Sequence, residues 1–367
     1  MRVLVWQWGR RGAGPRFATE LVRAFAAVPG TEALLSLSSS AELLASPDRP
    51  HCDVMMRTYS HLSGFLGRMA STPAIVPGLV DRLRRERIDV ALCAMPAAMD
   101  LVMATALCCA RVPFAVVVHD AEAHPGDRFP LQIQLQRWLL RAADGAFALS
   151  THVADRLREQ GLTKPLLMAA LPPFAYGPPP PPPRAHGGRL RLLSFGRLLP
   201  YKGLDLLADG LALLGARDDL EVRVVGSGPE SPELARLRAL PGVTVENRWV
   251  PEDEVGALLA WSDALVLSHR EASQSGVAAI AIAARRWVIA TKVGGLAEQL
   301  GKEPMAVLAE PSASCIAEAI RTLIARTEQA LPETGSPRLA WARIAESMLE
   351  GLHGLTPSRV REKVVTG

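Results

Sequence analysis

The chain has 367 residues, of which 49% are hydrophobic and 21% are charged, so it contains ample apolar material for packed cores. This composition excludes a wholly disordered or fibrous chain, and the length predicts about two domains. The 41 lysine and arginine residues are balanced by 37 aspartate and glutamate residues, which argues against a dedicated nucleic-acid-binding protein.

The cysteines and the apolar segments indicate where in the cell the protein is located. The five cysteines show no Cys-x-x-Cys spacing, so they favour a reducing compartment over a disulfide framework or a zinc site. Residues 1–6 are typical of a first strand and lack the pattern of a signal peptide. The apolar stretch 90–118 is interrupted by charged residues and prolines, which is typical of a buried strand, helix and strand. We expect a cytoplasmic protein, with peripheral contact at the inner face of the membrane left open.

The first half alternates short apolar runs with helical stretches. A Gly-rich turn over residues 9–15 follows the first strand, and an amphipathic helix is predicted over 17–28. The predicted strands cover residues 3–8, 33–37, 90–93, 114–118, 145–149 and 166–170. Nearly continuous apolar strands between helices indicate a parallel sheet that is covered on both faces.

Six consecutive prolines at residues 178–183 mark the centre of the chain. Proline fixes φ and has no N–H to donate, so this run predicts a semi-rigid, extended linker. We therefore place a linker at 178–188 between a domain over 1–177 and a domain over 189–335. A proline-rich ligand for a partner module is the alternative interpretation.

The second half repeats the alternation. Turns are predicted at residues 196–203 and 293–295, and helices at 204–214, 251–261 and 277–284. The predicted strands cover residues 190–195, 222–225, 243–246, 264–267 and 287–291. Two successive alternations of this kind predict two doubly wound, Rossmann-like α/β domains, whose ligands bind at the carboxyl ends of the strands.

Two elements of the second half could hold a diphosphate. Arg197 and Lys202 lie five residues apart in one turn after a strand, and Ser275, Gly276 and Val277 open a helix after another strand. Cations and the N-terminus of a helix both stabilise phosphate charge, including the charge that develops on a leaving group. Taken singly, an Arg or a Lys in a turn is usually only solvated, and it is their joint appearance with this helix start that favours a diphosphate site.

These residues belong to a recognisable pattern. The segment 195–207 resembles the donor-phosphate signature of the retaining GT-B glycosyltransferases of family 4 (glycosyl transferases group 1), and 225–229 and 288–298 resemble further signatures in the same order. Gly12, Ala13 and Gly14 lie where this family has a Gly-rich loop, and His119 lies where it has an active-site histidine. The resemblance implies a GT-B fold, with two Rossmann-like domains that face a central cleft. It also implies that a C-terminal helix at about 338–355 joins the acceptor-side first domain.

The resemblance assigns roles position by position. Arg197 and Lys202 would neutralise the donor diphosphate, and Glu271 would match the first Glu of the family's E-x7-E pattern and contact the donor sugar. The catalytic candidates are His119, Arg197, Lys202 and Glu271. The donor-binding candidates are Gly12, Ala13, Gly14, Gly196, Gly226, Ser275, Gly276 and Val277. The candidates on the acceptor side are Asp120, His124 and Asp127.

One position departs from the family pattern. Eight residues after Glu271 the sequence has Ala279, and with a one-residue insertion it has Ile280. The second Glu of the family accepts hydrogen bonds from the ribose of the donor. That contact is therefore either absent here or made by another group.

The resemblance implies a retaining, metal-independent glycosyltransferase. It would move a sugar from a nucleotide-sugar donor to a hydroxyl of a glycan or lipid-linked acceptor in bacterial polysaccharide or glycolipid assembly, without a cofactor or nucleic acid. The run Arg82, Arg84, Arg85 and Arg87 is either a solvated helix face or a peripheral contact with an anionic membrane. A GT-B sugar-nucleotide epimerase and a degenerate, non-catalytic binding subunit remain alternatives.

Overall fold

Contacts within the chain divide it into two units, which are described separately below. The structure is a computed structural model and describes residues 1–46, 49–59, 61–126, 130–326, 331–332 and 335–355. Unit 1 comprises the described residues of Met1–Glu122, Phe129–Ala170 and Arg338–Gly367, and unit 2 those of Ala123–Arg128 and Leu171–Pro337. The proline run and the short segment at 123–126 thus both belong to unit 2.

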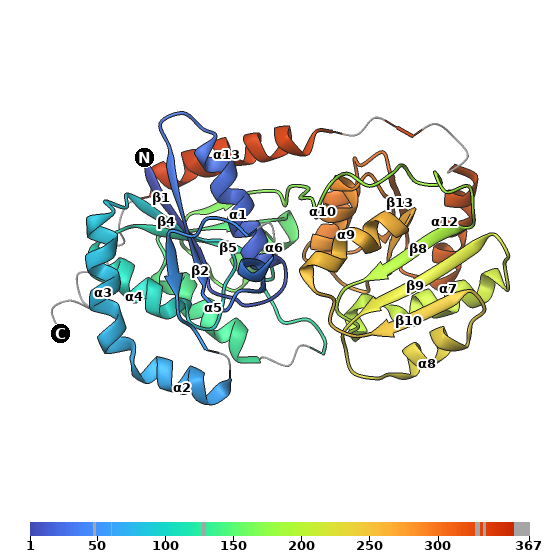
Figure 1. Cartoon of the computed structure of the whole chain (residues 1–367), viewed down its shortest axis with the longest axis horizontal. Helices are drawn as coiled ribbons and strands as arrows, with labels where there is room; N and C mark the ends of the chain where they lie inside the picture. Colours follow the sequence, from blue (N-terminus) through green and yellow to red (C-terminus); the bar gives the residue numbers. More distant parts are fainter. Residues whose placement is uncertain (47–48, 60, 127–129, 327–330, 333–334, 356–367) are drawn as a thin grey trace. The chain divides into compact units, whose positions relative to one another are not determined.

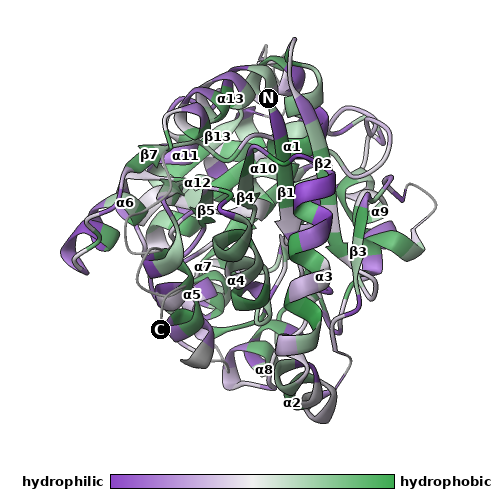
Figure 2. Cartoon of the chain, turned by 90° about the vertical axis from the view of Figure 1, so that its left-hand side faces the viewer, coloured by the Kyte–Doolittle hydropathy of each residue, from purple (hydrophilic) through white to green (hydrophobic). Residues whose placement is uncertain are grey.

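Unit 1 is a parallel seven-stranded sheet in the order β3-β2-β1-β4-β5-β6-β7 (Figure 1). The sequence predicts this sheet because strands covered on both faces are apolar throughout, and all five residues of β5 are buried. Figure 2 shows β1 and β4 as hydrophobic strands in the interior of the unit. The strands are β1 (Arg2–Gln7), β2 (Glu32–Ser38), β3 (Val54–Met56), β4 (Val90–Cys93), β5 (Phe114–Val118), β6 (Gly145–Ala148) and β7 (Leu166–Met168).

The helices of unit 1 correct one prediction from the sequence. Residues 9–15 were expected to form a turn, but α1 begins at Ala13, so Ala13 and Gly14 are helical. Pro15 does not prevent this, because a proline in the first turn removes an N–H that has no intrahelical partner. The helices are α1 (Ala13–Ala26), α2 (Leu62–Ala70), α3 (Thr72–Arg85), α4 (Asp100–Ala110), α5 (Pro130–Ala142), α6 (Thr151–Glu159) and α13 (Pro337–His353).

The C-terminal helix α13 packs in unit 1. The rings of Trp341 on α13 and Phe17 on α1 have centroids 5.9 Å apart, and Ala345, Met348 and Leu352 are buried. A chain that has built unit 2 therefore returns to complete the core of unit 1 with its last helix.

Unit 2 is a parallel six-stranded sheet in the order β10-β9-β8-β11-β12-β13 (Figure 1). Residues 293–295 were expected to form a turn, but α11 begins at Gly294. The strands are β8 (Leu190–Phe195), β9 (Leu220–Gly226), β10 (Val243–Asn247), β11 (Ala264–Leu267), β12 (Trp287–Thr291) and β13 (Ala306–Ala309). The helices are α7 (Leu204–Leu214), α8 (Pro232–Ala239), α9 (Glu252–Trp261), α10 (Gly276–Ala283), α11 (Gly294–Leu300) and α12 (Ala313–Arg326).

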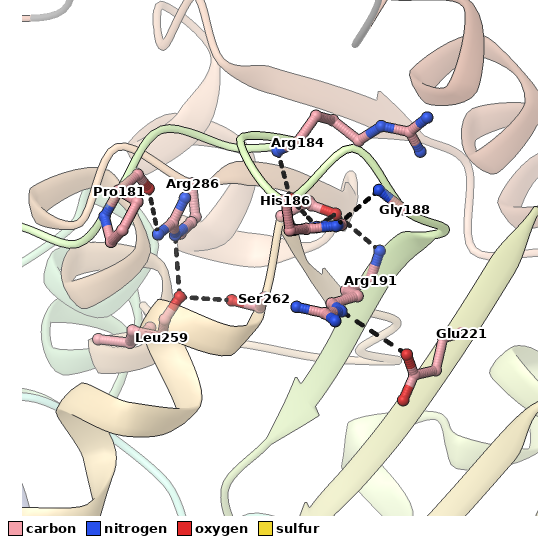
Figure 3. A network of polar contacts seen from close by, with 10 residues as sticks. Pro181, Arg184, His186, Gly188, Arg191, Glu221, Leu259, Ser262 and Arg286 are labelled. Atoms are coloured by element: carbon pink, nitrogen blue, oxygen red, sulfur yellow. Dashed lines mark hydrogen bonds and ion pairs between the residues drawn. The ribbon is translucent and has the colours of Figure 1, made fainter.

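A buried polar network holds the proline-rich segment against the rest of unit 2 (Figure 3). The guanidinium of Arg286, 1% exposed, donates to the carbonyl oxygens of Leu259 and Pro181 at 2.9 and 2.7 Å. The buried carboxylate of Asp263 accepts from the backbone N–H groups of Arg184 and Arg191. The segment is therefore fixed at two points, although proline itself cannot donate.

His186 adds a third contact to Asp263. The N–H of Gly188 donates to its Nδ1 at 3.0 Å, so Nε2 carries the proton and donates to the Asp263 carboxylate at 3.1 Å. The ring thus bridges the end of the segment and the start of β11.

Replacing Asp263 with alanine is expected to lower the free energy of unfolding by about 2 kcal/mol, because buried N–H donors lose their acceptor. Urea denaturation measures this change. The matched control is Asp219→Ala, which removes an exposed carboxylate paired with Arg217 in the same unit and should cost less than about 1 kcal/mol. Equal losses in the two variants would contradict a clamping role for Asp263.

Candidate functional site

The turn after β8 places two cations around one aromatic ring. The Arg197 Nη2 donates to the Tyr201 hydroxyl at 2.8 Å, and its guanidinium carbon lies 5.3 Å from the centroid of the Tyr201 ring. The Lys202 Nζ lies 5.1 Å from the same centroid. Tyr201 is 5% exposed, so the ring that holds both side chains is itself fixed in the unit. The two residues predicted to bind a diphosphate therefore both lie against the Tyr201 ring at the carboxyl end of the sheet.

Lys202 also contacts a buried histidine that the sequence analysis did not single out. Its Nζ lies 2.8 Å from Nε2 of His269, which follows β11 and is 2% exposed. Burial, and next the charge of Lys202, hold the pKa of His269 well below its usual range. The imidazole is therefore neutral at pH 7.

A segment from the first half of the chain completes this cluster. The ring of His124 stacks on Tyr201 with centroids 4.3 Å apart, and its Nδ1 lies 3.0 Å from Oε1 of Glu271. His124, which was predicted on the acceptor side, therefore lies against Glu271, which was predicted to contact the donor sugar. The Glu271 side chain is 50% exposed, so a ligand can reach its carboxylate.

The helix α10 begins five residues after Glu271, and a neighbouring helix holds its first turn. Ser275 is its N-cap, and the Ser275 hydroxyl accepts from the N–H of Ala278 at 3.2 Å. The amide of Gln299 on α11 both accepts from the Ser275 N–H and donates to its carbonyl oxygen, at 2.9 and 3.0 Å. This bracket orients the first turn, in which Gly276 and Val277 have N–H groups that a helix leaves without intrahelical partners. Such a terminus binds anions.

Glycine is required where the loops after β8 and β9 meet. A Cβ at Gly226 would lie 1.6 Å from the carbonyl oxygen of Gly196, and a Cβ at Gly228 would lie 2.1 Å from that of Leu198. The two loops can approach this closely only without side chains at these positions. Gly196 and Gly226 thus shape the turn that carries Arg197.

Of the described candidate residues in the first half, all but His124 lie in unit 1. Gly12 is the N-cap of α1 with φ of +84°, and a Cβ at Gly14 would lie 2.7 Å from Nε2 of Gln7. The carbonyl oxygen of Asp120 accepts from Gln136 at 2.7 Å. Asp127 lies outside the described residues.

His119 follows β5 and is 6% exposed. Its Nε2 lies 2.9 Å from the carbonyl oxygen of Ala94; since a carbonyl only accepts, Nε2 carries the proton. The ring meets Phe17 edge to face at 5.1 Å, and burial lowers its pKa. His119 is therefore a neutral imidazole of fixed orientation.

The second Glu of the family pattern has no ionisable replacement at its expected positions. Ala279 and Ile280 both lie in α10 and are 0% and 3% exposed. Within the described residues no group of three or more His, Cys, Asp or Glu side chains could hold a metal ion. None of the described helices combines the length and hydropathy needed to cross a membrane.

The buried His269 predicts a dependence of stability on pH. The pKa of His269 is lower in the folded than in the unfolded chain, so the unfolded chain binds more protons below about pH 6.5. The free energy of unfolding therefore decreases as the pH is lowered through this range. Urea denaturation of wild type and His269→Gln at about pH 5 and about pH 8 isolates this contribution. When the pH is lowered from about 8 to about 5, the free energy of unfolding should decrease more for the wild type than for the variant. An equal loss in both proteins would show that His269 is not held neutral.

Comparisons with known proteins give a family match in each half of the chain. The chain matches the family Glycosyltransferase Family 4 over residues 15–167 and the family Glycosyl transferases group 1 over residues 189–326. The 2-deoxystreptamine glucosyltransferase of Streptomyces kanamyceticus is 29% identical over 270 residues, which cover 66% of this chain and 67% of that protein.

Solved structures share the fold at low sequence identity. Anabaena HepE in complex with UDP and glucose superposes with a TM-score of 0.65 at 17% identity, over 100% of this chain and 98% of that one. The UDP-GlcNAc 2-epimerase of Neisseria meningitidis bound to UDP-GlcNAc has a TM-score of 0.58 at 12% identity, over 95% and 100% of the two chains. The fold is thus the GT-B fold, as predicted. With family matches in both units, the chain belongs to the GT-B glycosyltransferases of family 4, glycosyl transferases group 1.

Proposed function

We propose that the protein is a retaining, metal-independent glycosyltransferase that moves a sugar from a nucleotide-sugar donor to a hydroxyl of a glycan or lipid-linked acceptor, in bacterial polysaccharide or glycolipid assembly. The observation that carries this proposal is the pair Arg197 and Lys202, whose charged groups lie 5.3 and 5.1 Å from the centroid of the same Tyr201 ring. Two cations and the N-terminus of α10 at the carboxyl end of one sheet suit a diphosphate. The structure of HepE with UDP and glucose supports the choice of donor.

In the proposed reaction the donor diphosphate binds to unit 2. As the bond from the anomeric carbon to the phosphate oxygen breaks, negative charge grows on the diphosphate. The guanidinium of Arg197 and the ammonium of Lys202 stabilise that charge as fixed, preorganised groups. These cations supply what a divalent metal supplies in other transferases, so EDTA should leave turnover unchanged.

Glu271 and His124 act on the sugar in this scheme. The contact between His124 Nδ1 and Oε1 of Glu271 orients the carboxylate, and the exposed face of Glu271 accepts hydrogen bonds from sugar hydroxyls. Stacking on Tyr201 couples this pair to the diphosphate turn. One connected cluster would therefore bind both the sugar and the phosphates.

Retention requires no side chain as a dedicated base. The leaving phosphate oxygen takes the proton of the incoming hydroxyl on the same face from which it departs. Gly12 and the neutral His119, both in unit 1, stay predicted participants in this step. The anomeric configuration of the product, read by NMR, tests this step: retention supports it and inversion contradicts it.

We propose that the acceptor binds to unit 1. The basic run at the end of α3 is partly engaged, because Arg82 donates to the carbonyl oxygen of Asp53 and Arg84 to that of Cys109. In the same unit, Met55 is 64% and Leu66 61% exposed. Apolar and basic groups of this kind suit a peripheral contact with an anionic membrane. Co-sedimentation with anionic vesicles, but not with neutral ones, is the expected result.

A thermal-shift panel of UDP, GDP, ADP and dTDP sugars tests donor binding. A ligand that binds only the folded chain raises its melting temperature, by an amount that grows with ligand concentration over Kd. We expect one base to stabilise the protein selectively. No shift with any nucleotide sugar would contradict the proposal.

Product analysis with the selected donor separates the alternatives. A transferase needs an acceptor for transfer, whereas a GT-B epimerase converts the nucleotide sugar alone. Binding of the donor without turnover on any glycan or lipid-linked acceptor would favour a non-catalytic binding subunit.

The lost second Glu leads to a prediction about the ribose. A hydrogen bond to a carboxylate contributes about 1.5–3 kcal/mol, which is roughly 10- to 150-fold in affinity. Because Ala279 and Ile280 are buried and apolar, replacing the ribose of the ligand with 2′-deoxyribose should weaken its binding only slightly. Titration calorimetry with the preferred nucleoside diphosphate and its 2′-deoxy form should give Kd values within about threefold. A loss of tenfold or more for the 2′-deoxy form would show that another group makes the contact.

A further inference from the structure

His269 occupies a position that the proposed reaction does not yet use. It lies two residues beyond β11 and is 2% exposed, and its Nε2 faces the Lys202 ammonium at 2.8 Å. The Tyr201 ring meets it edge to face, with centroids 6.1 Å apart. A buried ionisable side chain in direct contact with the proposed phosphate-binding lysine calls for a functional explanation.

The backbone around this contact is clamped from both sides. The Ser268 hydroxyl donates to the carbonyl oxygen of Lys202 at 3.0 Å, and the N–H of Arg270 donates to that of Tyr201 at 2.8 Å. Thr291 on β12 donates to the carbonyl oxygen of His269 at 2.6 Å. The segment 268–270 therefore runs in fixed register beside the turn, with the imidazole opposite the ammonium.

The chemistry of the pair fixes the direction of its hydrogen bond. An ammonium group has three donors and no acceptor, so Nε2 of His269 must carry the lone pair and Nδ1 the proton. The groups that face the ring are Lys202, Tyr201 and, at longer range, His124; both Lys202 and His124 disfavour a protonated ring. A neutral acceptor orients the ammonium without cancelling its charge. A carboxylate at this position would neutralise the ammonium and compete with the phosphate for it.

We propose that His269 is a positioning residue for Lys202: its imidazole accepts one ammonium N–H and holds the charged group beside Tyr201, where the donor diphosphate would meet it. This inference rests on the proposed function, since it names the device that aims one of the two cations. It makes His269 part of the donor site without contact to the reacting atoms.

A double-mutant cycle tests the proposal, with wild type, His269→Leu, Lys202→Ala and the double variant titrated with UDP, GDP, ADP and dTDP. For the tightest of these ligands we expect Lys202→Ala to weaken binding at least about tenfold and His269→Leu about fivefold. In the Lys202→Ala background, His269→Leu should cost less than about twofold, because the group that it positions is gone.

The outcomes distinguish this inference from the function on which it rests. No loss of affinity in Lys202→Ala would overturn the proposed diphosphate site itself. A clear loss in Lys202→Ala, with either no loss in His269→Leu or an equal loss in both backgrounds, would overturn only the role of His269. The Lys202→Ala background thus serves as the internal control.

Two further measurements keep the test valid if His269→Leu fails to fold. His269→Gln retains an acceptor oxygen, so its Kd for the nucleoside diphosphate should lie within about threefold of the wild-type value, and its kcat should match that of the wild type. A merely space-filling role for His269 predicts no such rescue relative to His269→Leu. In the wild type, the ¹⁵N NMR signals of the imidazole should report a neutral ring with the proton on Nδ1 at pH 7. A charged ring or a proton on Nε2 would overturn the proposal.

Discussion

Lys202→Ala is expected to lower kcat about 100-fold while leaving the chain folded. Removing one preorganised group that stabilises developing negative charge costs on the order of 3 kcal/mol of transition-state stabilisation. Lys202 lies 5.1 Å from the centroid of Tyr201 and contacts His269, so its charge is aimed and partly withdrawn from water. Arg197→Ala should lower kcat by at least about tenfold for the same reason.

Steady-state kinetics with the preferred donor, together with thermal denaturation, measures both effects. The matched control is Lys302→Ala, which removes an exposed lysine of the same unit and should change kcat less than about twofold. Near-normal rates in both Lys202→Ala and Arg197→Ala would contradict the account of the site.

Gly203→Ala is expected to lower the free energy of unfolding by at least about 3 kcal/mol. Gly203 has φ of +64°, and a Cβ there would lie 2.0 Å from the carbonyl oxygen of Ser268. The strain of the left-handed conformation, about 1–2 kcal/mol, is therefore joined by an overlap with backbone that no rotamer relieves. The displaced segment also carries His269, so the affinity for the donor should fall as well.

Gly187→Ala is the matched control for this prediction. Gly187 lies in the same unit with φ of +67°, but nothing lies within 4 Å of a Cβ built on it. Urea denaturation should show only the conformational cost for Gly187→Ala, about 1–2 kcal/mol. Equal destabilisation in the two variants would mean that the turn moves freely away from Ser268.

The sheets could be predicted from the sequence because both are parallel and buried. In β4, β5, β11 and β12 the apolar run and the strand coincide, since burial on both faces leaves no polar alternation to blur the ends. The edge strand β3 has three residues with an exposed middle one, and a run this short carries no periodic signal. The start of α1 was missed because glycines and a proline predict a turn, whereas Pro15 is acceptable in a first helical turn.

The residues of the candidate site likewise fall into those that a local sequence motif indicates and those that only the folded structure shows. Arg197, Lys202 and Gly276 could be named as candidates from the sequence because they lie in short motifs that follow predicted strands. His124 and Glu271 meet across 147 positions of sequence, and no local pattern could predict that contact. His269 lies two residues before Glu271, and only the clamp between 268–270 and the turn reveals that it faces Lys202. Gln299 binds Ser275 from a neighbouring helix and was missed for the same reason.

A crystal structure of the protein with its preferred nucleoside diphosphate tests the central claim most directly. The account predicts phosphate oxygens within hydrogen-bonding distance of both the Arg197 guanidinium and the Lys202 ammonium, with the first amides of α10 facing the same anion. A diphosphate bound elsewhere, with the Lys202 and Arg197 side chains turned away from it, would contradict the account.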